Sequence, residues 1–224
     1  MENLTLIIPA KNEEESLPIF LEEIKDYPLN TIIIIPGNDQ KTKNSIKNFQ
    51  NLKIISQKKE GYGNAIIEGL SEVKTEYCCI INADGSMDPK YLEQMLKLCK
   101  ENDLVFASRY EKLNAGSDDD TIITLLGNKV FSFLGNLLFN LNISDILYTY
   151  ILGKTNSFKE LNLESYDFRL CIEIPIKAKR KNYNYVTSPS YERNRIAGQK
   201  KVNALKDGFL ILTEIIKYLF KIKK

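Results

Sequence analysis

Short apolar runs alternate with stretches of helical character over the first half of the chain. The apolar runs have the length and residue types of buried strands, and they cover residues 4–8, 31–35, 52–56, 77–81 and 104–108. The intervening stretches, several with apolar side chains at helical spacing, predict helices at residues 14–25, 41–49, 60–72 and 91–101. This alternation predicts an α/β fold, in which a mostly parallel central sheet is flanked by helices on both faces.

The pattern changes after Arg109. Residues 122–141 are largely apolar at helical spacing but are interrupted by polar side chains, which favours a helix or helix pair packed on the sheet over a membrane span. A position at a bilayer surface stays open. The remaining segments predict a polar loop, a short turn or strand, a helix with a proline, an edge strand and a final amphipathic helix at residues 114–120, 145–150, 168–181, 183–187 and 202–224.

Composition and charge exclude several classes of function. The 224 residues suit one large domain, and a net charge of +2 gives no reason to expect a nucleic-acid partner. Histidine is absent, which removes the commonest general base and zinc ligand. The four cysteines match neither a zinc site nor a disulfide framework, and no secretion signal is visible at Met1. We therefore expect a cytoplasmic protein, either free or at the cytoplasmic face of a membrane.

The fourth apolar run ends in a cluster of oxygen-bearing side chains. Asn82, Asp84, Ser86 and Asp88 follow it within seven residues, before Pro89 opens a helical pattern. Ligands of open α/β sheets bind at the carboxyl ends of strands, where such oxygens suit a hard divalent cation carrying a phosphorylated substrate. The alternative is a plain strand-to-helix turn with Asp88 as the N-cap. The residues alone support both interpretations.

Two further segments carry candidate chemistry. Gly61-x-Gly63 is not a dinucleotide fingerprint, so it indicates either a flexible loop or a close approach of backbone to a phosphate or sugar. Residues 191–201 bring several cations together in a segment with loop character. This segment is either a solvated surface loop or an anion clamp, in which arginine forks onto phosphate oxygens. Its candidate phosphate- or acceptor-binding side chains are Arg193, Arg195, Lys200 and Lys201.

In this order, the segments resemble family-2 glycosyltransferases of the GT-A fold, a Rossmann-like arrangement. The closest resemblance is to the branch of dolichol-phosphate mannose synthases and polyprenyl-phosphate glycosyltransferases, and it covers nearly the whole chain. It implies a single domain, with a nucleotide-sugar-binding half at residues 1–110, an acceptor-side half at residues 111–200 and a C-terminal amphipathic helix at residues 201–224.

The resemblance also implies roles for individual residues. Residues 7–13 resemble the opening strand and nucleotide loop, residues 61–65 the loop beside the donor, and residues 82–84 the Asp-x-Asp metal motif. Residues 107–110 resemble a segment whose arginine lies near the transferring group, and residues 145–150 the acceptor-side aspartate segment. The implied nucleotide-binding residues are Pro9, Ala10, Glu13, Asp39, Gly61, Gly63, Asn82 and Ala83. The implied catalytic residues are Asp84, Arg109 and Asp145, and the implied ligands of Mg²⁺ or Mn²⁺ are Asp84, Asn82 and Ser86.

Two positions depart from the family pattern. Asn82 stands where the metal motif begins with aspartate, and an amide oxygen can ligate a cation but adds no charge. The second strand is followed by Pro36-Gly37-Asn38-Asp39, where the family usually has paired acids that help to hold the base. Asp39 is the candidate substitute.

The implied reaction is the metal-assisted, inverting transfer of a sugar from a GDP- or UDP-linked donor. A polyprenyl (dolichyl or undecaprenyl) phosphate acceptor arrives ionised and needs no strong base, which agrees with a chain that lacks histidine. A saccharide hydroxyl acceptor would need a base, and Asp145 is the candidate. A degenerate relative that binds nucleotide without turnover is a further alternative. A sugar-phosphate nucleotidyltransferase is disfavoured, because residues 9–13 are not a glycine-rich basic loop.

Overall fold

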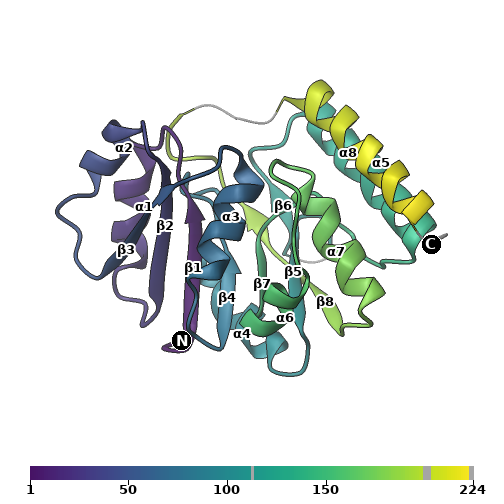
Figure 1. The fold of residues 1–224 in the computed structure, drawn as a ribbon, viewed down its shortest axis with the longest axis horizontal. Coiled ribbons are helices and arrows are strands. Elements are labelled where there is room, and N and C mark those ends of the chain that lie inside the picture. Colours follow the sequence, from purple (N-terminus) through teal and green to yellow (C-terminus); the bar gives the residue numbers. More distant parts are fainter. Residues whose placement is uncertain (112–113, 199–202, 222–224) are drawn as a thin grey trace.

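The computed structural model describes residues 1–111, 114–198 and 203–221 of the chain (Figure 1). The strands are β1 (Leu4–Pro9), β2 (Asn30–Pro36), β3 (Leu52–Gln57), β4 (Tyr77–Ile80), β5 (Leu104–Ser108), β6 (Gly116–Ser117), β7 (Ile151–Lys154), β8 (Tyr185–Pro189) and β9 (Tyr191–Glu192). The helices are α1 (Ser16–Ile24), α2 (Gln40–Ser45), α3 (Tyr62–Ser71), the 3-10 turn η1 (Pro89–Tyr91), α4 (Leu92–Cys99), α5 (Ile122–Phe139), α6 (Thr155–Glu160), α7 (Leu170–Arg180) and α8 (Ala204–Lys221).

Seven strands form one central sheet in the order β3-β2-β1-β4-β7-β5-β8. The pairs β1–β2, β2–β3, β1–β4 and β5–β8 are parallel, and helices supply the crossovers that parallel neighbours need. Among the strands of the described residues in this sheet, β7 alone runs antiparallel, between β4 and β5. The predicted α/β fold with a mostly parallel sheet is confirmed, as is the position of β8 at the sheet edge.

The sheet separates two apolar layers, because successive side chains of a strand point to opposite faces. On β1, Ile7 packs with the layer under α3, α6 and α7, whereas Leu6 and Ile8 pack with the layer under α1, α2 and α4. Cys78 and Cys79 of β4 divide in the same way, and all four cysteines are buried and free of disulfides. Buried on both faces, β1, β2 and β4 are continuous apolar runs.

The second half differs from its predicted form in several elements, among them the short strands β6 and β9 in segments that were predicted as loops. Residues 151–154 and 155–160 form β7 and α6, neither of which the sequence pattern predicted. Residues 122–139 form the single helix α5, which lies against α7 and α8 rather than directly on the sheet (Figure 1).

Helix α8 is amphipathic as predicted, but it carries apolar side chains on more than one side. Ile211, Ile215 and Tyr218 pack into the core. Phe209, Ile216 and Phe220 are instead exposed. The helix therefore has a second apolar side that does not pack on the domain.

Candidate active site

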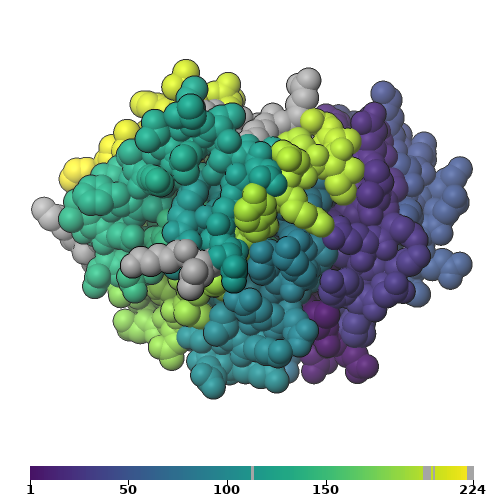
Figure 2. Space-filling view, turned by 180° about the vertical axis from the view of Figure 1, so that it is seen from behind, coloured from purple at the N-terminus to yellow at the C-terminus, as the bar shows by residue number. Residues whose placement is uncertain are grey.

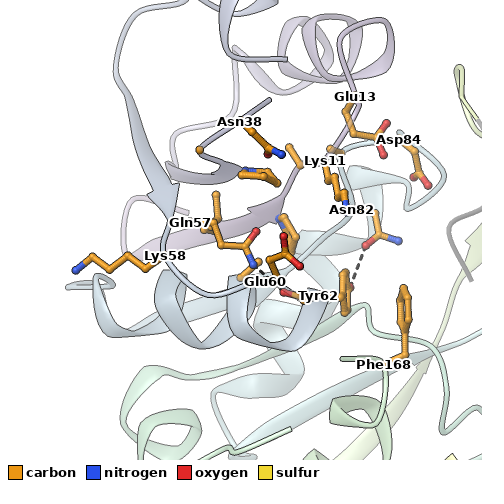
Figure 3. Close-up of a pocket in the computed structure, with 18 of the residues that line it drawn as sticks. Lys11, Glu13, Asn38, Gln57, Lys58, Glu60, Tyr62, Asn82, Asp84 and Phe168 are labelled. Atoms are coloured by element: carbon orange, nitrogen blue, oxygen red, sulfur yellow. Dashed lines mark hydrogen bonds between the residues drawn. The ribbon is translucent and has the colours of Figure 1, made fainter. Parts of the chain in front are cut away.

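A cavity of about 520 Å³ lies beyond the carboxyl ends of β1–β4 (Figure 3). This is the edge at which an open α/β sheet binds ligands. Residues from all four strand ends and from the start of α3 meet there. Eight of the residues predicted from the sequence line it: Pro9, Ala10, Glu13, Gly61, Asn82, Ala83, Asp84 and Arg195. Asp84, Pro9 and Arg195 thus share one cavity.

Asp84 is held by the turn that follows β4. Its Oδ1 accepts hydrogen bonds from the backbone N–H of Ser86 (3.1 Å) and from the Ser86 hydroxyl (2.8 Å). Its Oδ2 lies 3.6 Å from Nη1 of Arg195. Ser86 therefore fixes one oxygen of the Asp84 carboxylate. The second oxygen lies beside the Arg195 guanidinium, which lines the cavity. Ser86, predicted as a metal ligand, is itself buried and orients the carboxylate instead.

Asn82 is positioned by an aromatic pair. The Tyr62 hydroxyl donates to Oδ1 of Asn82 (3.1 Å) and, having only one hydrogen, accepts from the Thr149 hydroxyl (2.7 Å, Oη to Oγ1). The Tyr62 ring stacks on Phe168 with centroids 4.7 Å apart. Burial raises the pKa of Tyr62, so the phenol stays protonated and can donate at neutral pH. The Tyr62 hydroxyl thus engages one lone pair of the Asn82 amide oxygen, which orients the amide and leaves the second lone pair for a cation.

The basic segment after β9 is fastened to the same turn. The backbone N–H groups of Arg193 and Ile196 donate to the carbonyls of Ser86 (2.9 Å) and Asp84 (2.8 Å). Gly85 has a φ of +73°, and a Cβ at this position would overlap the Ile196 side chain. Gly85 therefore permits both the backbone conformation and the close approach.

The two arginines of this segment have different environments. Arg195 lines the cavity and donates from Nη2 to Oδ2 of Asp119 (3.1 Å). Arg193 turns away from it and forms a bidentate ion pair with Glu23 of α1 (2.7 and 3.0 Å). In Figure 2 this segment lies on the surface against the N-terminal part of the chain. Arg195 is consequently the better candidate for a phosphate contact, whereas Arg193 ties the segment to α1. Lys200 and Lys201 lie outside the described residues.

The predicted catalytic pair Arg109 and Asp145 lies outside the cavity. Asp145 is fully buried and accepts a bidentate ion pair from Arg109 (Nε–Oδ2 2.7 Å, Nη2–Oδ1 2.9 Å). Nη1 of Arg109 donates to Glu192 (2.9 Å). Burial opposes the charge of Arg109, but these carboxylates outweigh it and hold the pKa of Arg109 well above its usual value. The prediction of Asp145 as a general base is wrong in this structure, because its oxygens are paired and shielded from any substrate.

Two other predicted nucleotide-binding residues are structural. Asp39 accepts from the N–H of Thr42 (3.1 Å) as the N-cap of α2 and from the N–H of Asn12 (2.6 Å). Its neighbour Asn38 lines the cavity instead. Gly63 faces the Ser165 carbonyl, which a Cβ would overlap, so this glycine allows α3 to approach the 165–167 segment. Neither residue is among those that line the cavity.

Several lining residues were not assigned from the sequence. They are Lys11, Asn38, Gln57, Lys58, Glu60, Tyr62 and Phe168. Most of them lie directly beside predicted positions, so the position of the strand ends was a usable signal. No such signal marked Phe168, because this residue comes 86 residues after Asn82 in the chain.

The residues fit a cation that is shared with a ligand rather than one enclosed by protein. Within residues 1–111, 114–198 and 203–221, no three Asp, Glu or Cys side chains are grouped closely enough to hold a metal ion alone. Asp84 offers one carboxylate and Asn82 one amide. Mg²⁺ typically binds through one or two carboxylates together with substrate phosphates and water. The donor set is suited to that arrangement.

The sequence profile described as Glycosyl transferase family 2 matches residues 5–161, more than two thirds of the chain. Among curated proteins, uncharacterized glycosyltransferases from Mycobacterium bovis and Mycobacterium tuberculosis are 31% identical over 108 residues. The match spans 47% of this chain and 48% of each relative, which is about half the length of these proteins.

Solved structures share the fold at low sequence identity. Glucosyl-3-phosphoglycerate synthase from Mycobacterium tuberculosis, in complex with Mn²⁺, uridine diphosphate and glucosyl-3-phosphoglycerate, has a TM-score of 0.72 at 12% identity, covering 96% of this chain and 79% of its own. Mannosyl-3-phosphoglycerate synthase from Rubrobacter xylanophilus has a TM-score of 0.70 at 12% identity, with coverage of 98% and 74%. Both likenesses extend over nearly the whole chain and support the predicted architecture.

Proposed function

Because the chain belongs to glycosyl transferase family 2, we propose that it transfers a sugar from a nucleotide-sugar donor to an acceptor, with a divalent cation bound beside Asp84. One observation carries the proposal: a single cavity joins the ends of β1–β4, the Asp84 carboxylate and the Arg195 guanidinium. Family membership supports the reaction type. The cavity supports a donor that has both an organic base and a charged diphosphate.

The cavity divides by chemistry into two regions. Near β2 and β3, Asn38 offers an amide group to a base, with Pro9 and Pro36 as apolar walls. Gln57 offers its amide oxygen, because its Nε2 already donates to the carbonyls of Lys59 (2.6 Å) and Gly61 (2.8 Å). Toward β4, Asp84 and Arg195 provide opposite charges beside Asn82. We place the base and ribose in the first region and the diphosphate in the second.

Charge in the second region would assist departure of the nucleotide. Bound Mg²⁺ or Mn²⁺ would supply Lewis-acid stabilisation of the diphosphate, with Asp84 as its carboxylate ligand and Asn82 as a weaker amide ligand. Arg195 adds fixed positive charge at the same place, and preorganised charge of this kind is often the largest catalytic contribution. Ser86 keeps the Asp84 carboxylate in position throughout.

The acceptor we propose is a polyprenyl phosphate. A phosphate acceptor arrives ionised, whereas Asp145, the candidate base for a saccharide hydroxyl, is buried and paired with Arg109. The similar solved structures are named as phosphoglycerate synthases, so 3-phosphoglycerate is the competing acceptor to test. The donor of first choice carries UDP, since similar structures were solved with it, and a GDP-linked donor is the alternative.

Nucleotide binding and turnover can be measured separately. We expect one nucleoside diphosphate, UDP before GDP, to raise the melting temperature, and to do so more strongly with Mn²⁺ or Mg²⁺ present. At a hundredfold excess over Kd, binding adds about 2.7 kcal/mol to apparent stability. Sugar transfer to polyprenyl phosphate, 3-phosphoglycerate and a saccharide is then compared. Binding without turnover of any donor would favour the degenerate relative, and no binding of any nucleotide would contradict the proposal.

Replacing Tyr62 with phenylalanine tests how Asn82 is held. Tyr62→Phe keeps the ring against Phe168 but removes the hydroxyl from Asn82 and Thr149. We expect the Kd of the nucleotide in the presence of metal to rise by roughly three- to tenfold, the equivalent of one net hydrogen bond. Isothermal titration measures this change. Tyr183→Phe, which loses a hydroxyl bond to Glu160 away from the cavity, should leave the Kd unchanged; equal effects of both variants would contradict the role of Tyr62.

A further inference from the structure

Two neighbouring helices expose a large apolar surface at one end of the molecule. Helices α5 and α8 pack side by side there (Figure 1), and Figure 2 shows them on the outside of the protein. We define the α5–α8 face by exposed apolar side chains on both helices: Ile123, Leu126, Val130, Phe133, Leu137, Leu205, Phe209, Leu212, Ile216 and Phe220. Each is between 39% and 86% exposed. Monomeric soluble proteins seldom leave so many large apolar groups together in water.

The exposure of the apolar side chains on α5 follows from how this helix is attached to the domain. Helix α5 turns a polar stripe toward the domain: Asn128 donates to the Tyr110 hydroxyl (2.9 Å), Ser132 accepts from the N–H of Ile146 (3.0 Å), and Asn136 bonds both backbone groups of Ile143 (2.9 Å each). The apolar side of α5 consequently faces outward. This is the reverse of the usual arrangement for a surface helix, which buries its apolar stripe.

The same polar stripe argues that α5 lies on a membrane rather than crosses one. The helix is long and apolar enough to span a bilayer by length and composition, and 22% of it is buried. Crossing would require Asn128, Ser132 and Asn136 to leave their partners and enter hydrocarbon, where unpaired polar groups cost several kcal/mol each. A position in the plane of the interface keeps these bonds and immerses only the apolar side.

The charges around the face favour an anionic surface. Helix α5 has no acidic residue and one exposed lysine, Lys129. On α8, Lys206 and Lys217 are exposed. The acids of α8 are Asp207, which is half-buried, and Glu214, which is buried and accepts from Lys217 (2.8 Å). The cationic end of α7 adjoins α8, because Arg180 donates to the Tyr218 carbonyl (2.7 Å). The rim of the face is thus mainly positive.

We propose that the α5–α8 face docks the protein on the surface of an anionic lipid bilayer. The apolar side chains enter the headgroup and acyl boundary, and the surrounding lysines and arginine contact lipid phosphates. A second copy of the chain fits less well, because it would bring two positive rims together. The inference agrees with a lipid-linked acceptor but depends only on the helices.

Vesicle flotation of the full chain tests the proposal. With vesicles of phosphatidylcholine and phosphatidylglycerol we expect co-migration, which decreases with phosphatidylcholine alone or at raised ionic strength. The triple variant Leu126→Gln, Phe133→Gln, Phe209→Gln should bind the anionic vesicles at least about tenfold more weakly, since three large apolar groups are lost. Ile19→Gln, which removes an exposed apolar side chain on α1, should bind like the wild type.

The outcomes separate docking from catalysis and from self-association. No co-migration with anionic vesicles, or equal co-migration of the triple variant, would overturn the proposal. So would a wild-type dimer in light scattering that the triple variant converts to monomer, because the face would then belong to a second copy. The vesicles contain no polyprenyl phosphate, so an active enzyme that fails to float would refute docking alone.

Discussion

Replacing Asp84 with alanine is expected to lower kcat for sugar transfer by roughly 10²–10³-fold, the usual effect of removing one preorganised group that stabilises developing charge. Asp84 is the carboxylate at the end of β4, fixed by two bonds from Ser86 and placed 3.6 Å from Arg195. Its loss would remove the one charged cation ligand and leave Arg195 without this partner. Steady-state kinetics across a range of Mn²⁺ concentrations measures the change.

Two matched variants test whether the loss of a cation ligand causes the lower kcat of Asp84→Ala. Asp84→Asn keeps the shape of the side chain and can still accept from Ser86, so its defect should be smaller at high metal concentration. Asp88→Asn changes the neighbouring acid, which caps η1 through the N–H of Lys90 (2.9 Å) and does not line the cavity. It should retain near wild-type kcat. Full activity of Asp84→Ala would contradict a metal site at Asp84.

The second large effect concerns stability. Arg109→Met is expected to lower the free energy of unfolding by about 3–5 kcal/mol, as for other buried ion pairs that lose one partner. The substitution would leave Asp145 fully buried without its bidentate partner and would also deprive Glu192 of a cation. Glu192 is also buried, and this burial raises its pKa. Urea denaturation measures the loss.

Controls distinguish this role from the catalytic one predicted for Arg109 from the sequence. Lys97→Met removes an exposed ion pair with Glu93 and should not move the urea midpoint measurably. Below the unfolding transition, the activity of Arg109→Met per folded molecule should stay close to that of the wild type. Unchanged stability with lost activity would instead establish a catalytic arginine.

The sequence predicted strands β1, β2 and β4, and the cavity residues at the ends of these strands, well. Strands β1, β2 and β4 are buried on both faces, so their apolar runs are uninterrupted and their ends are marked by proline or polar residues. Because parallel strands end at one edge, locating Pro9 and Asp84 at strand ends was sufficient to bring them together. The agreement for this part of the cavity is a consequence of topology.

Features that depend on long-range partners were not predictable. Arg109 and Asp145 are 36 residues apart, and nothing in the local pattern shows that they neutralise each other. The β7 strand is a four-residue run that contains Gly153, so it lacks a distinct strand signature. In α8, apolar residues occur on both the buried and the exposed sides, and periodicity alone could not indicate which side the domain covers.

The antiparallel strand β7 constrains how the chain can be divided. Strand β5 has β7 and β8 as its neighbours and does not pair with β4, although β4 precedes it in the chain. A fragment that stops at residue 110 would carry β5 with neither of its hydrogen-bonding edges satisfied. During synthesis, β5 therefore has no place in the sheet until residues 151–154 have emerged. The sheet is complete only when β7 and β8 join the strands of the first 110 residues, so we expect these segments to fold as one unit.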